Sequence, residues 1–237
     1  MSKVLQDTWI LTLSALNNVL EINPIFIDDN GKEYWKEDCH IFIANGNTIT
    51  FPCAGLPKFV AVNGVDVTPT AFSSIKIGDE QVTGATVAAQ NGDTVHAIFD
   101  WENPTSQWMH WFSEIKQFGL NSETGKKNQI KNGYRAFRHM RITKPGALPK
   151  LDISNLTSLN GMFMDSTFNV DISHWNTLPI ANMGETFKNA TKFNQDLSKW
   201  CVSKIGSSPG GFDDNTPAWT LPKPGWGTCP PRSVDGN

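Results

Sequence analysis

The stretch FNVDISHW at residues 168–175 returns as FNQDLSKW at residues 193–200, 25 positions further along the chain. Five of the eight positions are identical, and Ile172 is matched by Leu197 as a sixth, conservative pair. A repeat of this kind indicates one structural unit used twice, with each copy packing against the next. We therefore take the repeat as the starting point for the fold.

The match extends backwards from these phrases. LNGMFMDSTFNVDISHW at residues 159–175 aligns with NMGETFKNATKFNQDLSKW at residues 182–200, and LDIS at residues 151–154 is a weaker copy. A period of about 24 residues is typical of leucine-rich-repeat solenoids, in which each coil adds a layer to one core. The large apolar residues of the repeat are expected to fill that core: Phe163, Phe168, Trp175, Phe187, Phe193 and Trp200.

Short polar residues recur as well, with Asn169 matched by Asn194 and Asp171 by Asp196. A tight coil turns backbone groups inward, and short polar side chains can satisfy them, so we predict a polar ladder of these four residues. The two aspartates would lie about 4.8 Å apart, close to the carboxylate spacing of retaining glycosidases. The repeat accounts for both aspartates without catalysis, and we expect no catalytic residue here.

The shared pattern, an apolar-Phe turn followed by F-N-x-D-[IL]-S-x-W, resembles the BspA-like leucine-rich repeats of bacterial surface proteins and mycoplasma lipoproteins. The segment from SKW at 198–200 to GWGTCP at 225–230 resembles the closing segment of such repeats in tailed-phage proteins. The resemblance covers residues 108–230 and implies adhesion and surface recognition rather than catalysis.

Residues 1–104 read differently, as short strand-like segments separated by Gly, Asn and Pro, which predicts an antiparallel β sandwich or barrel. Asn30-Gly31 and Asn45-Gly46 each lie between apolar runs and predict β-hairpins with type I′ turns. The second hairpin would bring Cys39 close to Cys53, making them candidates for a disulfide. Cys201 and Cys229 are the other candidate pair, and four thiols remain the alternative.

The character of the sequence changes near residues 101–104. Apolar residues then follow the i, i+3, i+4, i+7 spacing of an amphipathic helix over residues 108–118, namely Trp108, Trp111, Phe112, Ile115 and Phe118. The expected fold class is α+β or mainly β. It comprises an all-β anchoring module at 1–104, a leucine-rich-repeat-like solenoid at 105–205 with clear coils at 159–181 and 182–205, and an irregular Pro/Gly-rich cap at 206–237.

Charge divides the chain in the same place. Residues 1–104 hold 13 acidic and five basic residues, whereas residues 105–237 hold ten acidic and 15 basic ones. A basic stretch at 126–150 could bind nucleic acid or an anionic polysaccharide such as the phosphates of lipopolysaccharide. Alternatively it is a solvated edge of the first coil, or it docks on the acidic module. The candidate residues are Lys126, Lys127, Lys131, Arg135, Arg138 and Arg141.

Other classes of site find no support in the sequence. The five histidines have no metal-ligand spacing, C-x-x-C pairs are absent, and neither G-x-S-x-G nor a phosphate-binding loop occurs, so we expect no metal and no cofactor. No run approaches 18 apolar residues, so we expect no membrane insertion. The first 20 residues fit a cleaved signal peptide poorly.

These observations, with the resemblance, favour a non-enzymatic phage virion protein of the fibre, decoration or baseplate type, located in the virion. Its expected partners are other virion proteins, further copies of itself, and a host cell-surface glycan or protein; we do not expect nucleic-acid binding. One alternative is a bacterial cell-surface adhesin. The other is a glycan-active virion enzyme, with an acidic pair drawn from Asp28, Asp29, Glu33 or Asp38.

Overall fold

The computed structural model describes residues 26–27, 29–35, 38–51, 53, 55–77, 80–99, 101, 111–119, 125–142 and 144–231. These residues are mainly β, with several antiparallel sheets, a short 3-10 helix at Leu148–Lys150 and no α-helix among them. The elements are β1 Phe26–Ile27, β2 Glu33–Tyr34, β3 His40–Ala44, β4 Thr48–Thr50, β5 Phe59–Val62, β6 Val65–Asp66, β7 Ser73–Ile77, β8 Glu80–Gly84, β9 Thr86–Ala88, β10 Thr94–Ile98, β11 Phe112–Gln117 and η3 Leu148–Lys150.

The largest sheet has five strands in the order β11-β3-β10-β5-β6, and all of its pairings are antiparallel. Side chains alternate across it as the pleat requires. Phe42 and Val95 face a core that also holds Ile49 of β4 and Val87 of β9. Ile41 and its neighbours on the other face pack with Tyr34 and Phe26 of the β1–β2 hairpin. Both faces of the sheet are therefore covered.

The hairpin expected around Asn30-Gly31 is confirmed, because β1 pairs with β2. Its turn is not the predicted type I′, because Gly31 has a positive φ of +78° but Asn30 does not have a positive φ. The second expected hairpin is wrong. β3 pairs with β10 and β11, whereas β4 pairs with β9, so the turn at Asn45-Gly46 carries the chain from one sheet to another.

This change of sheet also separates the two N-terminal cysteines. Cys39 packs with the residues behind the five-stranded sheet, and Cys53 packs with the main core on its other face. Both are buried thiols that are not joined in a disulfide, contrary to the pairing expected from the sequence. Cys201 and Cys229, the other candidate pair, do form a disulfide.

The predicted helix at 108–118 is also wrong wherever it can be checked. Residues 108–110 lie outside the described part of the chain, and residues 112–117 form β11, the edge strand that pairs with β3. Two irregularities in register, between Phe112 and Glu114 and between Ile115 and Gln117, change which side chains face inward. Phe112, Ile115 and Phe118 are consequently all fully buried at a spacing of three, which imitates the burial pattern of a helix.

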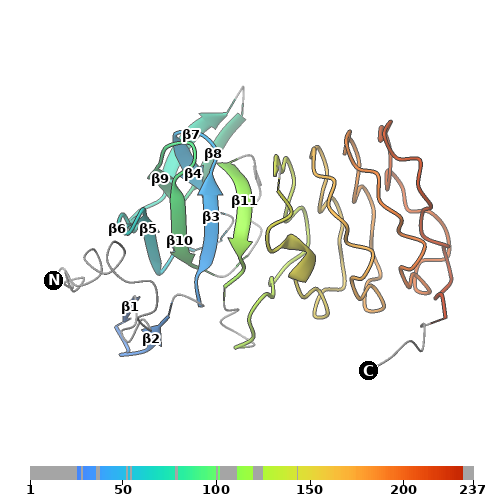
Figure 1. Cartoon of the computed structure of the whole chain (residues 1–237), viewed down its shortest axis with the longest axis horizontal. Coiled ribbons are helices and arrows are strands. Elements are labelled where there is room, and N and C mark those ends of the chain that lie inside the picture. Colours follow the sequence, from blue (N-terminus) through green and yellow to red (C-terminus); the bar gives the residue numbers. More distant parts are fainter. Residues whose placement is uncertain are drawn as a thin grey trace, which may run out of the picture.

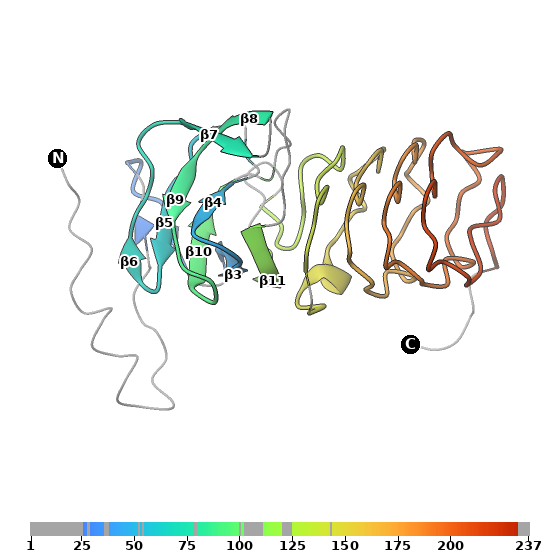
Figure 2. The ribbon, with the colours of Figure 1, turned by 90° about the horizontal axis from the view of Figure 1, so that it is seen from above.

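From residue 132 the chain winds into four stacked turns, seen side by side from yellow-green to red in Figures 1 and 2. We call them coils 1 to 4, at residues 132–157, 158–181, 182–207 and 208–231. In coils 1 to 3, alternate backbone N–H groups donate to carbonyl oxygens 23 or 25 residues further along, at N–O distances of 2.8–3.1 Å. At the start of coils 2 and 3, Ser158 and Asn182 pair in a parallel β-bridge.

Residues 206–231 do more than the irregular cap expected from their Pro and Gly content. Glu185, Phe187 and Asn189 of coil 3 donate to Gly210, Phe212 and Asp214, so this segment continues the stack as its last coil. The Cys201–Cys229 disulfide joins it covalently to coil 3. The tail aromatics Phe212 and Trp219 are buried, and Trp226 is partly buried against them.

Aromatic rings run through the middle of the coils. Phe137, Phe163 and Phe187 lie one above another with centroids 5.6 Å apart, and Phe212 follows at 5.4 Å. At the other end Phe137 lies 5.4 Å from Trp101, next to the five-stranded sheet. The sheet and the coils therefore share one continuous core. All six residues predicted to fill the repeat core are buried in it.

The junction between sheet and coils is closely fitted. Gly119 follows β11, and a Cβ on it would lie 2.4 Å from Asp38 O, so only glycine fits. The Gly119 N–H donates to His40 Nδ1 at 3.0 Å, which makes Nδ1 an acceptor and places the proton of the neutral ring on Nε2. Nε2 lies 3.0 Å from Phe99 O. One buried histidine thus connects the ends of β3, β10 and β11.

Candidate functional site

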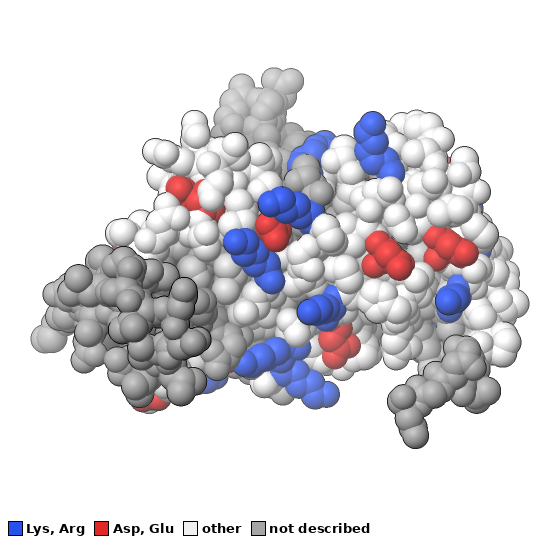
Figure 3. Space-filling model, viewed as in Figure 1, with Lys and Arg blue, Asp and Glu red and all other residues white. Residues whose placement is uncertain are grey.

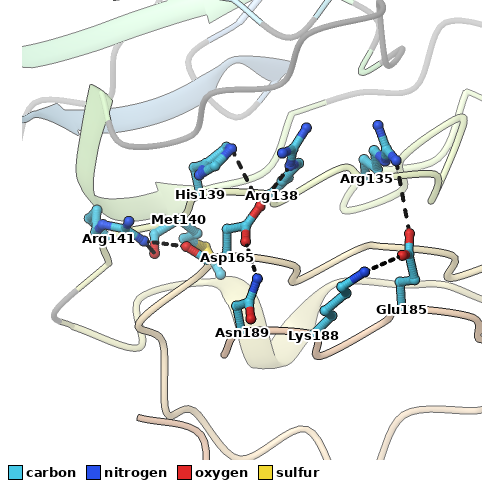
Figure 4. A network of polar contacts seen from close by, with 9 residues as sticks. All are labelled: Arg135, Arg138, His139, Met140, Arg141, Asp165, Glu185, Lys188 and Asn189. Carbon is cyan, nitrogen blue, oxygen red and sulfur yellow. Dashed lines mark hydrogen bonds and ion pairs between the residues drawn. The ribbon is translucent and has the colours of Figure 1, made fainter. Parts of the chain in front are cut away.

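The three arginines of the basic stretch lie along one edge of coil 1 and are directed at coils 2 and 3 (Figure 4). Arg138 Nε donates to Asp165 Oδ2 at 3.0 Å, and Arg141 Nη1 donates to the backbone oxygen of Asp165 at 2.6 Å. Arg135 Nη2 lies 3.9 Å from Glu185 Oε2. All three guanidinium groups are partnered within the chain, as is the neighbouring Lys188 with Glu185 at 2.7 Å.

The three lysines of the same stretch are exposed. Lys127 Nζ lies 3.7 Å from Asp38 Oδ1, a contact with the acidic N-terminal part of the kind that the docking alternative requires. Figure 3 shows blue and red side chains interspersed on the face it displays, with no continuous blue stripe over the coils. The predicted anionic-surface site is thus divided into paired arginines on the coil edge and exposed lysines next to the sheet.

Asp165 is the centre of the contacts drawn in Figure 4. Its Oδ1 accepts from Asn189 Nδ2 at 2.8 Å, and its Oδ2 faces both Arg138 and His139, the latter at 3.6 Å. Burial tends to raise the pKa of Asp165, but hydrogen bonds from Asn189 and Arg138 and the nearby positive charges outweigh it, so the pKa lies below the usual value. The carboxylate is therefore ionised and holds three coils together.

This pKa shift predicts how stability depends on pH. A carboxyl whose pKa is lowered by folding stabilises the folded state above the unfolded pKa of about 4, and this contribution is lost as pH falls through the folded pKa. We expect Asp165→Asn to melt at a lower temperature than the wild type near neutral pH and to lose less stability between about pH 5 and pH 3. Asp214→Asn, at an exposed position of coil 4, is the control. Parallel melting curves of Asp165→Asn and wild type across this range would contradict the assignment.

A second feature of this edge is a column in which charged residues alternate with glycine. The column consists of Arg135, Gly161, Glu185 and Gly211, one from each coil, and all four have positive φ between +51° and +70°. A Cβ on Gly161 would lie 2.8 Å from Arg135 Cγ, and one on Gly211 would lie 3.1 Å from Glu185 Cγ. Each long side chain therefore lies over the glycine of the next coil, which is how Arg135 reaches Glu185 two coils away.

We expect Gly161→Ala to lower the free energy of unfolding by about 2–3 kcal/mol, because strain at φ +62° adds to a close contact with Arg135. Gly125→Ala is a matched control. Gly125 has a similar φ of +65°, but its added Cβ would meet nothing within 4 Å, so only the strain of about 1 kcal/mol should appear. Equal losses for the two variants in urea titrations would show that Arg135 does not pack on Gly161.

A second column consists of His139, Asp165, Asn189 and Asn215, all with φ between +56° and +59°. Asn189 donates to Asp165, and Asn215 Nδ2 donates to Asn189 Oδ1 at 3.0 Å, so an amide ladder crosses coils 2, 3 and 4. Sequence analysis missed this ladder. The available signal was the recurrence of Asp or Asn, which tolerate left-handed backbone, two residues after the Phe of coils 2 and 3.

The predicted ladder of Asn169, Asp171, Asn194 and Asp196 separates into two kinds of contact. Asn169 Oδ1 accepts from the backbone N–H of Asn194 at 2.9 Å, and Asn194 Oδ1 accepts from the N–H of Thr220 at 2.9 Å, so the asparagines connect coils. Each aspartate instead accepts from the N–H two residues ahead, at Ser173 and Ser198, within its own coil.

Those serine hydrogen bonds are the main reason that the pKa values of Asp171 and Asp196 both lie below the usual value. A retaining glycosidase needs one carboxyl with a raised pKa to act as the acid. The pair is shifted in the opposite direction, which supports the interpretation that it shapes the turn. Of the acidic residues named for the alternative enzyme, Asp38 accepts from the Trp35 N–H at 3.0 Å and Asp28 lies outside the described residues.

A shallow open groove of about 320 Å³ lies between coils 1 and 2. Coil 1 lines it with the end of η3 and with Leu151, Asp152 and Ile153, and coil 2 lines it with His174, Trp175 and Asn176 at the end of the repeated phrase. Pro149 O at its rim lies 2.6 Å from His174 Nε2 and accepts from Trp175 Nε1 at 3.3 Å. Trp175 is only 5% exposed, so its ring does not offer a stacking surface.

The described residues contain no group of three or more His, Cys, Asp or Glu placed to hold a metal ion. Within the same residues, no helix is both long and apolar enough to cross a membrane.

Comparison with known proteins places the coils in context. Residues 105–220, just under half of the chain, match the model of a family described as "Mycoplasma protein of unknown function, DUF285". The match agrees loosely with the resemblance to BspA-like repeats found in the sequence. No curated protein and no solved structure matches the chain. The chain is thus a mainly β protein whose second half is similar to a mycoplasma repeat family.

Proposed function

We propose that this chain is a non-enzymatic structural protein of a tailed-phage virion, of the fibre, decoration or baseplate type. Its coils would form a short leucine-rich-repeat-like solenoid, displayed for adhesion to the host surface, and its N-terminal sheets a sandwich that attaches it to the particle. The virion assignment rests on the likeness of residues 198–230 to the closing segment of phage repeat proteins.

The proposal of adhesion is supported by the contacts that the polar side chains of the coils make. Arg138, Asp165 and Asn189 bond to one another across coils instead of converging on a cleft. Such contacts fix the coils as a rigid layered surface, and rigid presented surfaces suit recognition because little entropy is lost on binding.

A bacterial cell-surface adhesin is the second candidate, favoured by the resemblance of the repeat to the BspA-like repeats of bacterial surface proteins. An antibody against the chain separates the two. Labelling of purified phage particles supports the virion protein, and labelling of intact uninfected cells supports the adhesin.

Adhesion itself is tested by co-sedimentation of the labelled chain with intact bacteria of several strains at low and moderate salt. We expect saturable binding to some strains. The double variant Lys126→Ser, Lys131→Ser should weaken binding if the exposed lysines next to the sheet contact an anionic polysaccharide. Lys192→Ser, Lys199→Ser removes the same charge from exposed sites on coil 3 and is the control. A folded chain that sediments with no strain overturns the adhesion proposal.

A further inference from the structure

Coils 1 to 3 each present a row of backbone donors to the coil that follows. In coil 2 the N–H groups of Gly161, Phe163 and Asp165 donate to Gly184, Thr186 and Lys188 of coil 3. The equivalent donors are Arg135, Phe137 and His139 in coil 1, and Glu185, Phe187 and Asn189 in coil 3. The intervening residues form turns within their own coil, as Met164 does with Gly161.

Coil 4 repeats this geometry but lies at the end of the stack (Figure 1). Phe212 and Asp214 make the internal turns, with bonds to Pro209 and Gly211. Gly211 and Asn215 have φ values of +70° and +56°, close to those of their counterparts in coil 3. The N–H groups of Gly211, Asp213 and Asn215 are therefore placed to donate onwards, and no acceptor for them occurs among the described residues.

The apolar interior at this end is closed, in contrast to the backbone. Phe212 and Trp219 are only 1% and 6% exposed although coil 4 is the last coil among the described residues. The amide ladder also stops here, because Asn215 donates to Asn189 while no donor of a further coil reaches Asn215 Oδ1. The end of the stack is thus protected against nonspecific apolar contact but retains a row of directional polar groups.

We propose that the outer edge of coil 4, defined by Gly211, Asp213 and Asn215, is a docking site for an extended, basic polypeptide segment of a partner protein. Alternate carbonyl oxygens of that segment accept from the three N–H groups, as those of the next coil do at the three interfaces inside the stack. A second copy docked end to end would place donors against donors. A free anion is disfavoured by the exposed carboxylate of Asp214.

The preference for a basic segment follows from the negative charge of Asp214 beside this edge. Asp214 is exposed beside this edge, and Lys188 of coil 3, whose pKa is raised mainly by Glu185 and to a smaller extent by Asp214, lies on its inner side. A cation on the outer side of Asp214 would be held in the same way. This inference does not depend on whether the chain belongs to a virion.

The test uses the full chain and a synthetic peptide of residues 182–207 with Cys201→Ser, because this sequence supplies the carbonyls that receive the donors of coil 2. Amide hydrogen exchange is followed with the peptide or with a scrambled peptide of equal composition. We expect exchange at Gly211, Asp213 and Asn215 to slow by about tenfold or more with the peptide alone. If these amides are protected without peptide as strongly as those of Gly161, Phe163 and Asp165, or if the peptide has no effect, the proposal is overturned.

Two variants at residue 213 distinguish the contribution of the backbone N–H to peptide binding from that of the carboxylate. Asp213→Pro removes the central donor, whereas Asp213→Ala keeps it and removes only the side chain that pairs with Lys223. Binding of the peptide should fall about tenfold in Asp213→Pro and persist in Asp213→Ala. Asn215→Gly, which keeps both the N–H and the left-handed backbone, provides a second check should Asp213→Pro fold poorly; it should weaken binding less than threefold. Equal binding by Asp213→Pro and Asp213→Ala contradicts the assignment.

Discussion

Replacing Trp200 with alanine should lower the free energy of unfolding by about 3–5 kcal/mol. The side chain is 0% exposed, and its ring lies 6.1 Å from that of Phe187 in the core of coil 3. Its Nε1 donates to Ile172 O of coil 2 at 3.0 Å, so truncation leaves both a cavity and a buried carbonyl without its donor. For a chain of this size the melting temperature should fall by about 10 °C.

Trp226→Ala is the matched control for this prediction. Trp226 also packs on an aromatic neighbour, with its ring centroid 4.8 Å from that of Phe212, but it is only partly buried at the end of the stack. We expect a loss of about 1–2 kcal/mol, because less apolar surface returns to water. A melting temperature unchanged by Trp200→Ala would contradict the stacked core.

The second large effect is expected at Phe137, which lies between the five-stranded sheet and the coils. Its ring is 5.4 Å from Trp101, 6.1 Å from Phe118 and 5.6 Å from Phe163, and its side chain is fully buried. Phe137→Ala should cost about 3–5 kcal/mol. Because the core is continuous through this ring, we expect one calorimetric transition for the wild type and two for Phe137→Ala.

Phe193→Ala removes the same side chain from a fully buried position in coil 3 and leaves the junction intact. It should destabilise the protein to a similar extent while preserving one transition. Calorimetric traces of the same shape for the two variants would show that Phe137 does not couple the sheet to the coils.

Coupling of this kind bears on the proposed display of the coils. Contacts at Phe137, Gly119 and His40 fix the coils to the five-stranded sheet. The coils would therefore keep a constant orientation relative to the N-terminal module that is proposed to attach the protein to a particle. The disulfide between coils 3 and 4 fixes the other end. The proposed docking edge of coil 4 is thereby held in a defined position at the far end of the stack.

The sequence by itself determined the repeat and its core. Phe163, Phe187 and Trp200 recur because each occupies the same site in successive layers, so copies in sequence become neighbours in space. The β1–β2 hairpin around Asn30-Gly31 was also predicted from local sequence, although not its turn type. The interpretation of Asp171 and Asp196 as turn residues also follows from contacts only two residues apart.

Only the tertiary structure decided the remaining features, because each depends on a partner far away in sequence. The spacing of Phe112, Ile115 and Phe118 fits a helix, and only pairing with β3 and its bulges makes the segment a strand. The two strands beside Asn45-Gly46 pair with different partners, β3 with β10 and β4 with β9. This pairing separates Cys39 from Cys53. Likewise, the sequence alone does not show that the arginines of the basic stretch are paired with Asp165 and Glu185. Electrostatic pairing depends on distance in space, which only the folded chain determines.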